Sequence, residues 1–231
     1  MKKLLSVVML CGIFITAKSQ VYVQGGVNLA NITKTNSGQT QDNNLLTTFN
    51  AGILGRFGLS KPIDLESGIL FVGRGAKSNT YFSSSTSDNY VKSKFNPYYL
   101  EVPLNVVLRF PLDKHCNIFV NAGPYVEMGI AGKSKTEVNA FGATSTSTEN
   151  IKFSNDNPFT SQQDDASYNK LKRFGFGVNA GGGVDLGAII LKVNYEYGLT
   201  KINSTESNNS DNDKNKYRTL SFSVGIPLSR K

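Results

Sequence analysis

Hydrophobic and polar residues alternate with a period of two along most of this chain, and such alternation predicts β-strands. The pattern is clearest in residues 95–110, where every even position from 98 onward is apolar. Glu101 and Arg109 lie on the opposite face, with Val107 as an apolar exception. The same alternation recurs in eight segments, which we expect to form strands: residues 21–32, 46–60, 64–82, 95–110, 117–132, 173–187, 188–199 and 217–228.

The length of these segments and the connections between them favour a membrane barrel. Each segment reaches the roughly 9–11 residues that a tilted strand needs to cross a bilayer, whereas ordinary strands usually have about 5–6. Long polar connections alternate with short ones, as in outer-membrane barrels with long extracellular loops and short periplasmic turns. The long connections are residues 33–45, 83–94, 133–172 and 200–216, and the short ones are residues 61–63, 111–116 and 187–188.

The sequence therefore predicts an all-β protein that forms an eight-stranded, antiparallel, up-and-down transmembrane β-barrel with both termini on the periplasmic side. A soluble lipocalin-like barrel or a β-sandwich is the alternative, because antiparallel sheets of soluble proteins also present one face to water. The strand lengths, the asymmetry of the loops, and the small and charged residues of the polar face favour the membrane barrel.

The polar faces of the predicted strands would line the interior of this barrel. Eight strands enclose a space just wide enough for side chains to fill, so charges inside must pair and hydrogen-bond. Basic and acidic residues nearly balance on these faces, and we expect a structural charge network in a filled lumen. Its predicted members are Arg56, Glu66, Arg74, Glu101, Arg109, Glu127, Asp185, Lys192 and Glu196.

Glycine and aromatic residues agree with a small barrel. Several of the 22 glycines, including Gly177 and Gly183, fall on the predicted inward face. A missing side chain there makes room for long neighbours and lets the strands bend. Aromatic residues near the strand ends predict girdles at the two membrane interfaces; they are Tyr22, Phe82, Tyr98, Phe110, Tyr195, Tyr197 and Tyr217.

Residues 1–19 have the layout of a cleavable secretory signal peptide. Two lysines precede an apolar run that is too short for a transmembrane helix, and residues 17–19 (Ala-Lys-Ser) match a cleavage site. We therefore expect export to the outer membrane, with residues 20–231 as the barrel domain. Loss of three lysines lowers the formal charge from +8 to +5, and an exported chain without a basic stripe predicts no nucleic-acid partner.

No pattern in the sequence is typical of catalysis or of a bound cofactor. Cys116 lies beside His115 in a short predicted turn, where adjacent side chains rarely have the geometry of a nucleophile and its base. Acidic pairs in the long loops, such as Asp164-Asp165, are expected to be solvated rather than to hold calcium. We therefore expect no enzyme activity, no catalytic, cofactor-binding or metal-binding residues, and no intramolecular disulfide.

Four motifs carry a resemblance to a known family. They are Gly-Gly-Val-Asn-Leu-Ala-Asn-Ile at 25–32, Tyr-Tyr-Leu-Glu-Val-Pro-Leu at 98–104, Asn-Ala-Gly-Pro-Tyr at 121–125 and Tyr-Glu-Tyr-Gly-Leu at 195–199. Through them the mature chain resembles the outer-membrane β-barrel domain family of Bacteroidetes, which includes PorT-like proteins. The resemblance implies an outer-membrane location, an eight-stranded barrel and no enzyme activity. Some members of that family assist a secretion system.

The leading hypothesis is a non-enzymatic barrel that is structural or binds a partner, such as a secretion or envelope complex. Outer-membrane lipid would surround it. An envelope protein partner would bind the loops, because loops on a rigid scaffold commonly carry binding. The alternatives are a narrow solute channel and a soluble periplasmic lipocalin-like binding protein. The loops in question are residues 33–45, 83–94, 133–172 and 200–216.

Overall fold

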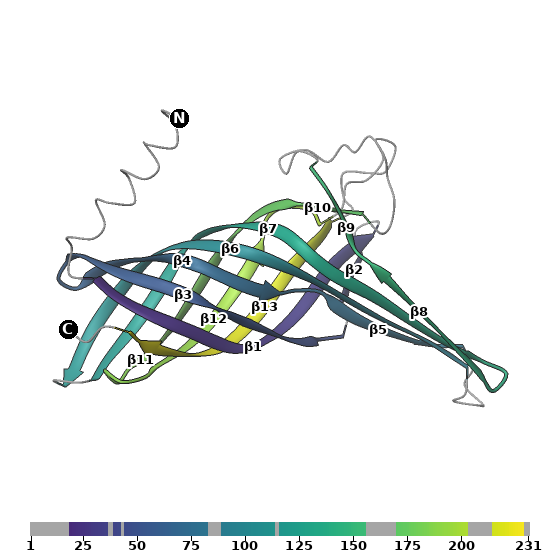
Figure 1. Cartoon of the computed structure of the whole chain (residues 1–231), viewed down its shortest axis with the longest axis horizontal. Helices are drawn as coiled ribbons and strands as arrows, with labels where there is room; N and C mark the ends of the chain where they lie inside the picture. The colour runs from purple at the N-terminus through teal and green to yellow at the C-terminus, as the bar shows by residue number, and fades with distance from the viewer. Residues whose placement is uncertain are drawn as a thin grey trace.

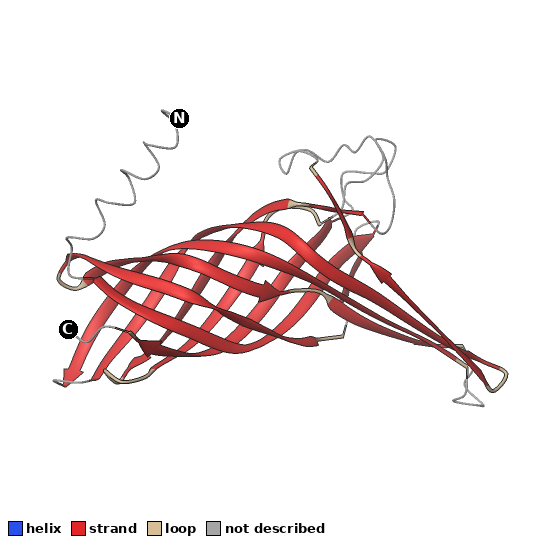
Figure 2. Cartoon of the chain, viewed as in Figure 1, coloured by secondary structure: helices blue, strands red, loops and turns tan. Residues whose placement is uncertain are grey.

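The strands of this protein close into a barrel (Figures 1 and 2). The computed structural model describes residues 19–36, 39–42, 44–82, 89–113, 116–155, 170–202 and 214–228. Most of the predicted signal peptide, His115 and the Asp164-Asp165 pair lie outside these ranges. The strands of the barrel are β1 (Ser19–Asn36), β3 (Leu46–Ser60), β4 (Ile63–Gly73), β6 (Tyr90–Asp113), β7 (Cys116–Ala140), β11 (Phe174–Asp185), β12 (Ile190–Gly198) and β13 (Lys214–Pro227).

Antiparallel pairing closes the ring. Each barrel strand pairs with the next one along the chain, from β1 with β3 through to β12 with β13. The last strand then pairs with the first, in a register that runs from Tyr22–Pro227 to Thr35–Lys214. A closed ring pairs backbone N–H and C=O groups between strands, as a bilayer requires. The prediction of an eight-stranded antiparallel up-and-down barrel is confirmed.

Apolar side chains cover the outside of the barrel and polar side chains fill the inside. Ile53 and Leu104 point outward with exposed fractions of 54% and 48%, whereas Arg56 and Glu101 point inward at 1%. This distribution suits a barrel surrounded by lipid and is the reverse of a lipocalin-like barrel in water, so the soluble alternative is wrong. Within the described part of the chain, no helix has the length and apolar character needed to cross a bilayer.

The predicted strand at 64–82 is two strands in the structure. β4 ends at Gly73, and β5 (Ala76–Tyr81) follows after two residues. Gly75 adopts a φ of 122°, in a region that favours glycine, and a Cβ at this position would collide with the backbone oxygen of Phe95. Both strands pair with β6, and Arg74, in the break between them, is fully buried.

Large parts of two predicted loops are strands. In the region predicted as loop 83–94, β6 already begins at Tyr90, and in the region 133–172, β7 continues to Ala140 before β8 (Ala143–Asn150) pairs back onto it. The prediction failed because both faces of these strands are polar or exposed, so no alternation marks them. We name the four-stranded sheet formed by β5, residues 90–96 of β6, residues 131–140 of β7 and β8 the extension (Figure 1).

The other two predicted loops also contain strand residues. In the loop predicted at 33–45, β1 runs on to Asn36 and pairs with β2 (Gln39–Asp42). In the loop predicted at 200–216, β13 begins at Lys214. The opposite end of the barrel has tight connections, at Lys61-Pro62 and between β11 and β12. Since outer-membrane barrels have short periplasmic turns, the extension lies on the extracellular side.

Two of the predicted girdle aromatics lie inside the barrel instead. Tyr22 and Tyr217 are 0% and 4% exposed, because each shares strand parity with inward polar residues. On the outside, Phe49, Phe71 and Tyr98 form an aromatic stack, in which Phe71 lies 5.6 Å from Phe49 and 5.2 Å from Tyr98 between ring centroids. This stack marks the extracellular end of the apolar surface.

A charge on the outer face tests its contact with lipid. Leu104→Arg, in the middle of the outward row of β6, is expected to lower the free energy of unfolding by about 2–4 kcal/mol. Val138→Arg is the matched control, because Val138 is 38% exposed but lies on the extension; its effect should stay within about 0.5 kcal/mol. Urea titration in lipid vesicles, read by heat-modifiable gel mobility, gives both values. Equal losses would contradict the lipid-facing assignment.

Candidate functional site

Arg74 is the centre of a charged cluster at the extracellular end of the lumen. It is 0% exposed. Its Nε donates a hydrogen bond to Glu127 at 2.7 Å, its Nη1 to Glu196 at 2.5 Å and its Nη2 to Glu101 at 2.5 Å. One guanidinium therefore binds three buried carboxylates that would otherwise repel one another. These contacts join β6, β7 and β12 to Arg74, which lies in the break between β4 and β5.

An apolar and aromatic cap covers this cluster. The Cζ atom of Arg74 lies 5.1 Å from the ring centroid of Tyr125, and the hydroxyls of Tyr99 and Tyr217 are 3.1 Å apart. The short parallel strands β9 (Lys152–Ser154) and β10 (Lys170–Lys172) bring part of the predicted loop 133–172 over these rings. The buried cap residues are Ile32, Ala76, Tyr99, Ile151, Leu171, Ile202 and Tyr217, with Phe95 and Phe153 packed against them.

Glu66 is the centre of a second cluster, nearer the short turns. It is 0% exposed and accepts hydrogen bonds from Arg56 Nε at 2.7 Å, from Lys192 Nζ at 2.5 Å and from the Tyr22 hydroxyl at 2.7 Å. Asp185 Oδ2 lies 3.9 Å from Arg56 Nη1. Two cations thus face two carboxylates, and this cluster is electrically balanced.

The remaining predicted charge, Arg109, pairs with Asp64 near the periplasmic end. Arg109 Nε lies 2.5 Å from Asp64 Oδ2, and its side chain is 25% exposed. Asp64 was not among the predicted members, although it begins the segment 64–82. The nine predicted residues all lie along the lumen, but in two clusters and one separate pair rather than in a single network.

A layer of amides lies between the two clusters. Asn50 Nδ2 donates to Asn28 Oδ1 at 2.5 Å, and Gln24 Nε2 donates to Asn50 Oδ1 at 3.2 Å. A cavity of about 10 Å³ adjoins this layer and is bordered by Lys192 and Glu196, among others. Such a volume holds about one water molecule. It is too small for a larger solute.

The charged side chains of the two clusters bind one another. Glu66, Glu101, Glu127 and Glu196 each accept charge-assisted hydrogen bonds from arginine or lysine. Cys116, which the structure does describe, lies at the start of β7. Among the described residues, no group of three or more His, Cys, Asp or Glu side chains is placed to hold a metal ion.

Apolar residues that point into the lumen were not predicted. Leu54 lies two residues before Arg56, and Leu70 lies four residues after Glu66, so strand parity could have placed both inside. Val107 was the one noted exception to the polar face, and it is 0% exposed. The buried cluster comprises Tyr22, Leu54, Leu70, Val72, Val107, Phe119 and Ile190.

Gly183 leaves the space that Phe119 occupies. The Phe119 ring covers the Arg56 guanidinium, with Cζ 4.0 Å from the ring centroid. A Cβ at Gly183 would collide with the backbone oxygen of Leu191 and meet the Phe119 ring at 2.8 Å. Gly183→Ala is therefore expected to cost about 1–3 kcal/mol of unfolding free energy.

Gly25→Ala is the matched control, because a Cβ there would meet nothing within 4 Å. Its effect should stay within about 0.5 kcal/mol. Urea titration of the two refolded variants in detergent micelles compares them, and a loss of the same size at both positions would show that Gly183 has no special packing role.

Comparisons with known proteins give a family match and several structural neighbours. A family model described as outer membrane protein beta-barrel domain matches residues 16–204. The search among curated proteins gives no significant match. Among solved structures, the attachment invasion locus protein Ail of Yersinia pestis, in complex with the heparin analogue sucrose octasulfate, is 14% identical, with a TM-score of 0.40 and coverage of 91% of this chain and 99% of its own. Neisserial surface protein A is 13% identical, with a TM-score of 0.38 and coverage of 90% and 97%.

Proposed function

Because the chain belongs to the outer membrane protein beta-barrel domain family, we propose that it is a non-enzymatic integral membrane protein whose barrel presents an extracellular binding surface. The filled lumen carries this proposal. Two clusters of buried ion pairs and the cap occupy it, centred on Arg74, Glu66 and Tyr217. A barrel filled in this way does not pass solutes, so the parts that remain available to partners lie outside it.

The nine predicted lumen residues have a structural role in this proposal. Arg74, Glu101, Glu127 and Glu196 tie three strands together at one end, and the cluster around Glu66 does so at the other. A rigid barrel can then hold the extension and the neighbouring loops in fixed positions. Residues 1–19 would act as the signal peptide that directs the chain to the outer membrane.

The partner is proposed to be a protein of the cell envelope, and the PorT-like resemblance favours a secretion or envelope complex. The extension supports this proposal, because it projects well beyond the barrel and exposes every residue of β8 (Figure 2). Such a sheet offers side chains on both faces and an unpaired edge strand, which are common elements of protein recognition.

Photo-cross-linking in intact cells tests the binding surface. A photoreactive residue replaces Ser147 on the extension or, as the control, Ser60 beside the periplasmic turn; both are exposed. A discrete adduct with an envelope protein is expected at Ser147 and absent at Ser60. Adducts at Ser60 alone, or at neither position in cells with normal amounts of folded protein, would overturn the proposed partner surface.

A further inference from the structure

The two faces of the extension differ strongly in charge. Residues that pair directly across strands share one face, and the register places Lys77 opposite Lys94 and Lys94 opposite Lys135. Lys92 and Lys133 lie on the same face, because alternate residues of a strand point to the same side. We name these five residues the lysine patch. The opposite face of the paired strands carries no lysine or arginine.

Contacts within the chain balance little of this positive charge. Glu137 is the one acidic residue that the pairing places on the same face. Among the described residues, Lys135 is the only lysine of the patch with an ion pair, in which its Nζ lies 3.8 Å from Glu137 Oε2. Lys92 Nζ lies 3.9 Å from the ring centroid of Tyr90. Because lysines directly opposite each other across strands repel, a bound polyanion would relieve a repulsion that the folded chain retains.

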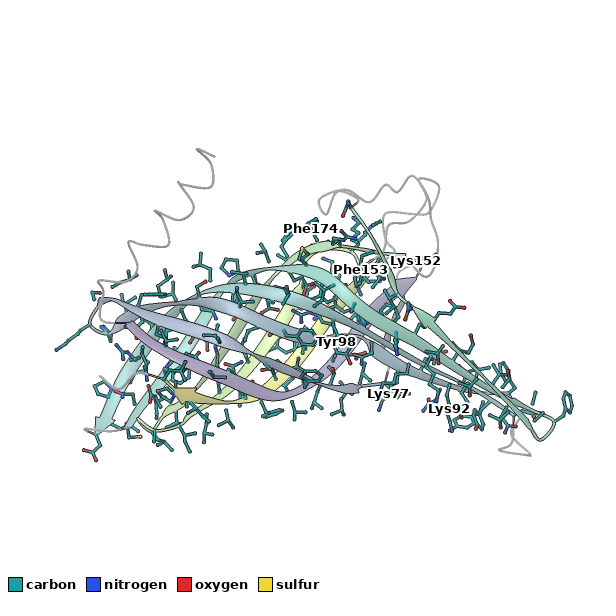
Figure 3. All side chains as sticks on the ribbon, viewed as in Figure 1. Lys77, Lys92, Tyr98, Lys152, Phe153 and Phe174 are labelled. Atoms are coloured by element: carbon teal, nitrogen blue, oxygen red, sulfur yellow. The ribbon has the colours of Figure 1, made fainter. Side chains whose placement is uncertain are left out.

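The extension carries the lysine patch away from the barrel. Its four strands run on past the extracellular end of the barrel (Figure 1), and Figure 3 shows Lys77 and Lys92 on it, beyond Tyr98. Three lysines of the patch are exposed and the other two are half-buried. A partner can therefore reach the patch from the medium outside the cell.

The spacing of the lysines suits a linear polymer of anions. Neighbouring strands lie about 4.8 Å apart, so the row formed by Lys77, Lys94 and Lys135 spans roughly 10 Å across the sheet. Lys92 and Lys133 lie about 7 Å along the strands on either side of this row. An isolated anion would reach only part of this band, whereas a chain with regularly repeated anions could contact all of it.

Amide and hydroxyl side chains surround the lysines on the same face. Both kinds of group donate and accept hydrogen bonds, as the hydroxyls of sugars do. The face therefore offers partners for repeated anions and for hydroxyls together, and an acidic polysaccharide contains both. The surrounding residues are Asn79, Asn96, Asn139, Thr144, Thr146, Thr148 and Asn150.

Other polyanions suit this face less well. Single-stranded nucleic acids stack successive bases on aromatic side chains, but the aromatic residues of this face are one edge-on pair at its far end, Tyr81 and Tyr90, with ring centroids 6.3 Å apart. The paired strands of the extension contain no arginine, which is the residue that binds guanine or phosphate through two parallel hydrogen bonds. The centre of a protein interface is usually apolar, whereas lysines, amides and hydroxyls form the centre of this face.

We infer that the lysine patch binds an acidic polysaccharide outside the cell, through ion pairs between its ammonium groups and the sulfate or carboxylate groups of the polymer. This inference goes beyond the proposed function and needs only that the barrel hold the extension on the extracellular side. The opposite face of the extension, which includes Ser147, stays available to the proposed protein partner.

Titration with soluble polymers tests this inference. The folded protein in uncharged detergent micelles is titrated with fluorescently labelled dextran sulfate, with polygalacturonate and, as the uncharged control, with dextran. We expect both acidic polysaccharides to bind and dextran not to bind. The affinity should fall as salt is added, because interactions between exposed charges are screened over about 10 Å at 0.1 M ionic strength.

Two matched double variants locate the binding surface. Lys94→Gln with Lys135→Gln should bind dextran sulfate about five- to tenfold more weakly, because two exposed ion pairs are lost. Its folding should not suffer, because the substitutions also remove a like-charge repulsion. Lys61→Gln with Lys216→Gln removes the same charge outside the extension, at the periplasmic turn and on β13, and should bind as the wild type does. Heat-modifiable mobility verifies that both variants are folded.

Three results would overturn the inference. The first is that neither acidic polysaccharide binds. The second is an equal loss of affinity in the two double variants, which would reduce the effect to net charge. The third is tighter binding of single-stranded DNA or of polyglutamate than of either polysaccharide at the same concentration of negative charge. None of these results affects the adduct expected at Ser147, so failure of this inference is distinguishable from failure of the proposed function.

Discussion

Arg74→Met is expected to lower the free energy of unfolding by about 3–5 kcal/mol, which is the cost of removing one partner from a buried ion pair. The effect should lie at the upper end of that range, because three carboxylates lose their shared cation. Glu101, Glu127 and Glu196 would remain buried with no counterion from Arg74. Urea titration of the refolded protein in detergent micelles, followed by circular dichroism and gel mobility, measures the loss.

Neutralising the three carboxylates separates the cost of unpaired buried charge from the cost of changed packing. Glu101→Gln, Glu127→Gln and Glu196→Gln in the Arg74→Met background should restore a large part of the stability, because no unpaired charge stays buried. Lys135→Met is the matched control: its pair with Glu137 is 51% exposed on the lysine side and 28% on the glutamate side, so the loss should be about 1 kcal/mol or less. Equal losses for Arg74→Met and Lys135→Met would mean that burial of the charges does not determine the stability of the barrel.

Glu66→Leu should have the second largest effect, again about 3–5 kcal/mol. Glu66 accepts charge-assisted hydrogen bonds from Arg56 and Lys192, which are 1% and 7% exposed. Leucine would leave both cations without their main acceptor in the middle of the barrel. The same urea titration measures the change.

Glu137→Gln is the control for Glu66→Leu. Glu137 lies on the extension, and its ion pair with Lys135 is partly exposed, at 3.8 Å. The expected loss is about 1 kcal/mol or less. If Glu66→Leu were as stable as Glu137→Gln, the Glu66 cluster would not be holding the strands together.

Alternation was enough to predict the barrel, because lipid on one side and a packed lumen on the other impose opposite polarity on neighbouring residues. It gave β3 its observed limits, Leu46–Ser60. It also placed residues such as Arg74 and Glu196 on the inward face, since strand parity alone decides that face. The charged character of the lumen was therefore accessible from the sequence.

Which charged side chains pair within the lumen could not be predicted from the sequence, because the pairing depends on the register of the strands and the shear of the barrel. Glu66 and Lys192 are 126 positions apart in the chain, and no local pattern relates them. The predicted aromatic girdle was wrong at Tyr22 and Tyr217. Both were assigned to it because they lie near strand ends, whereas the alternation along each strand places them on the inward face. The extension was missed for a different reason: beyond Ala76 and Phe95 at its base, its strands have no buried face, so a strand and a polar loop have the same composition there.

Conductance across a planar lipid bilayer tests the central claim most directly. The claim is that the ion clusters and the cap fill the lumen of a membrane-spanning barrel, so that its function lies on the extracellular surface. Folded wild-type protein, verified by heat-modifiable mobility, is inserted at increasing amounts under an applied voltage in concentrated salt. The account predicts no current steps above those of the bare membrane. Reproducible steps of uniform size that scale with the amount of inserted protein would contradict it.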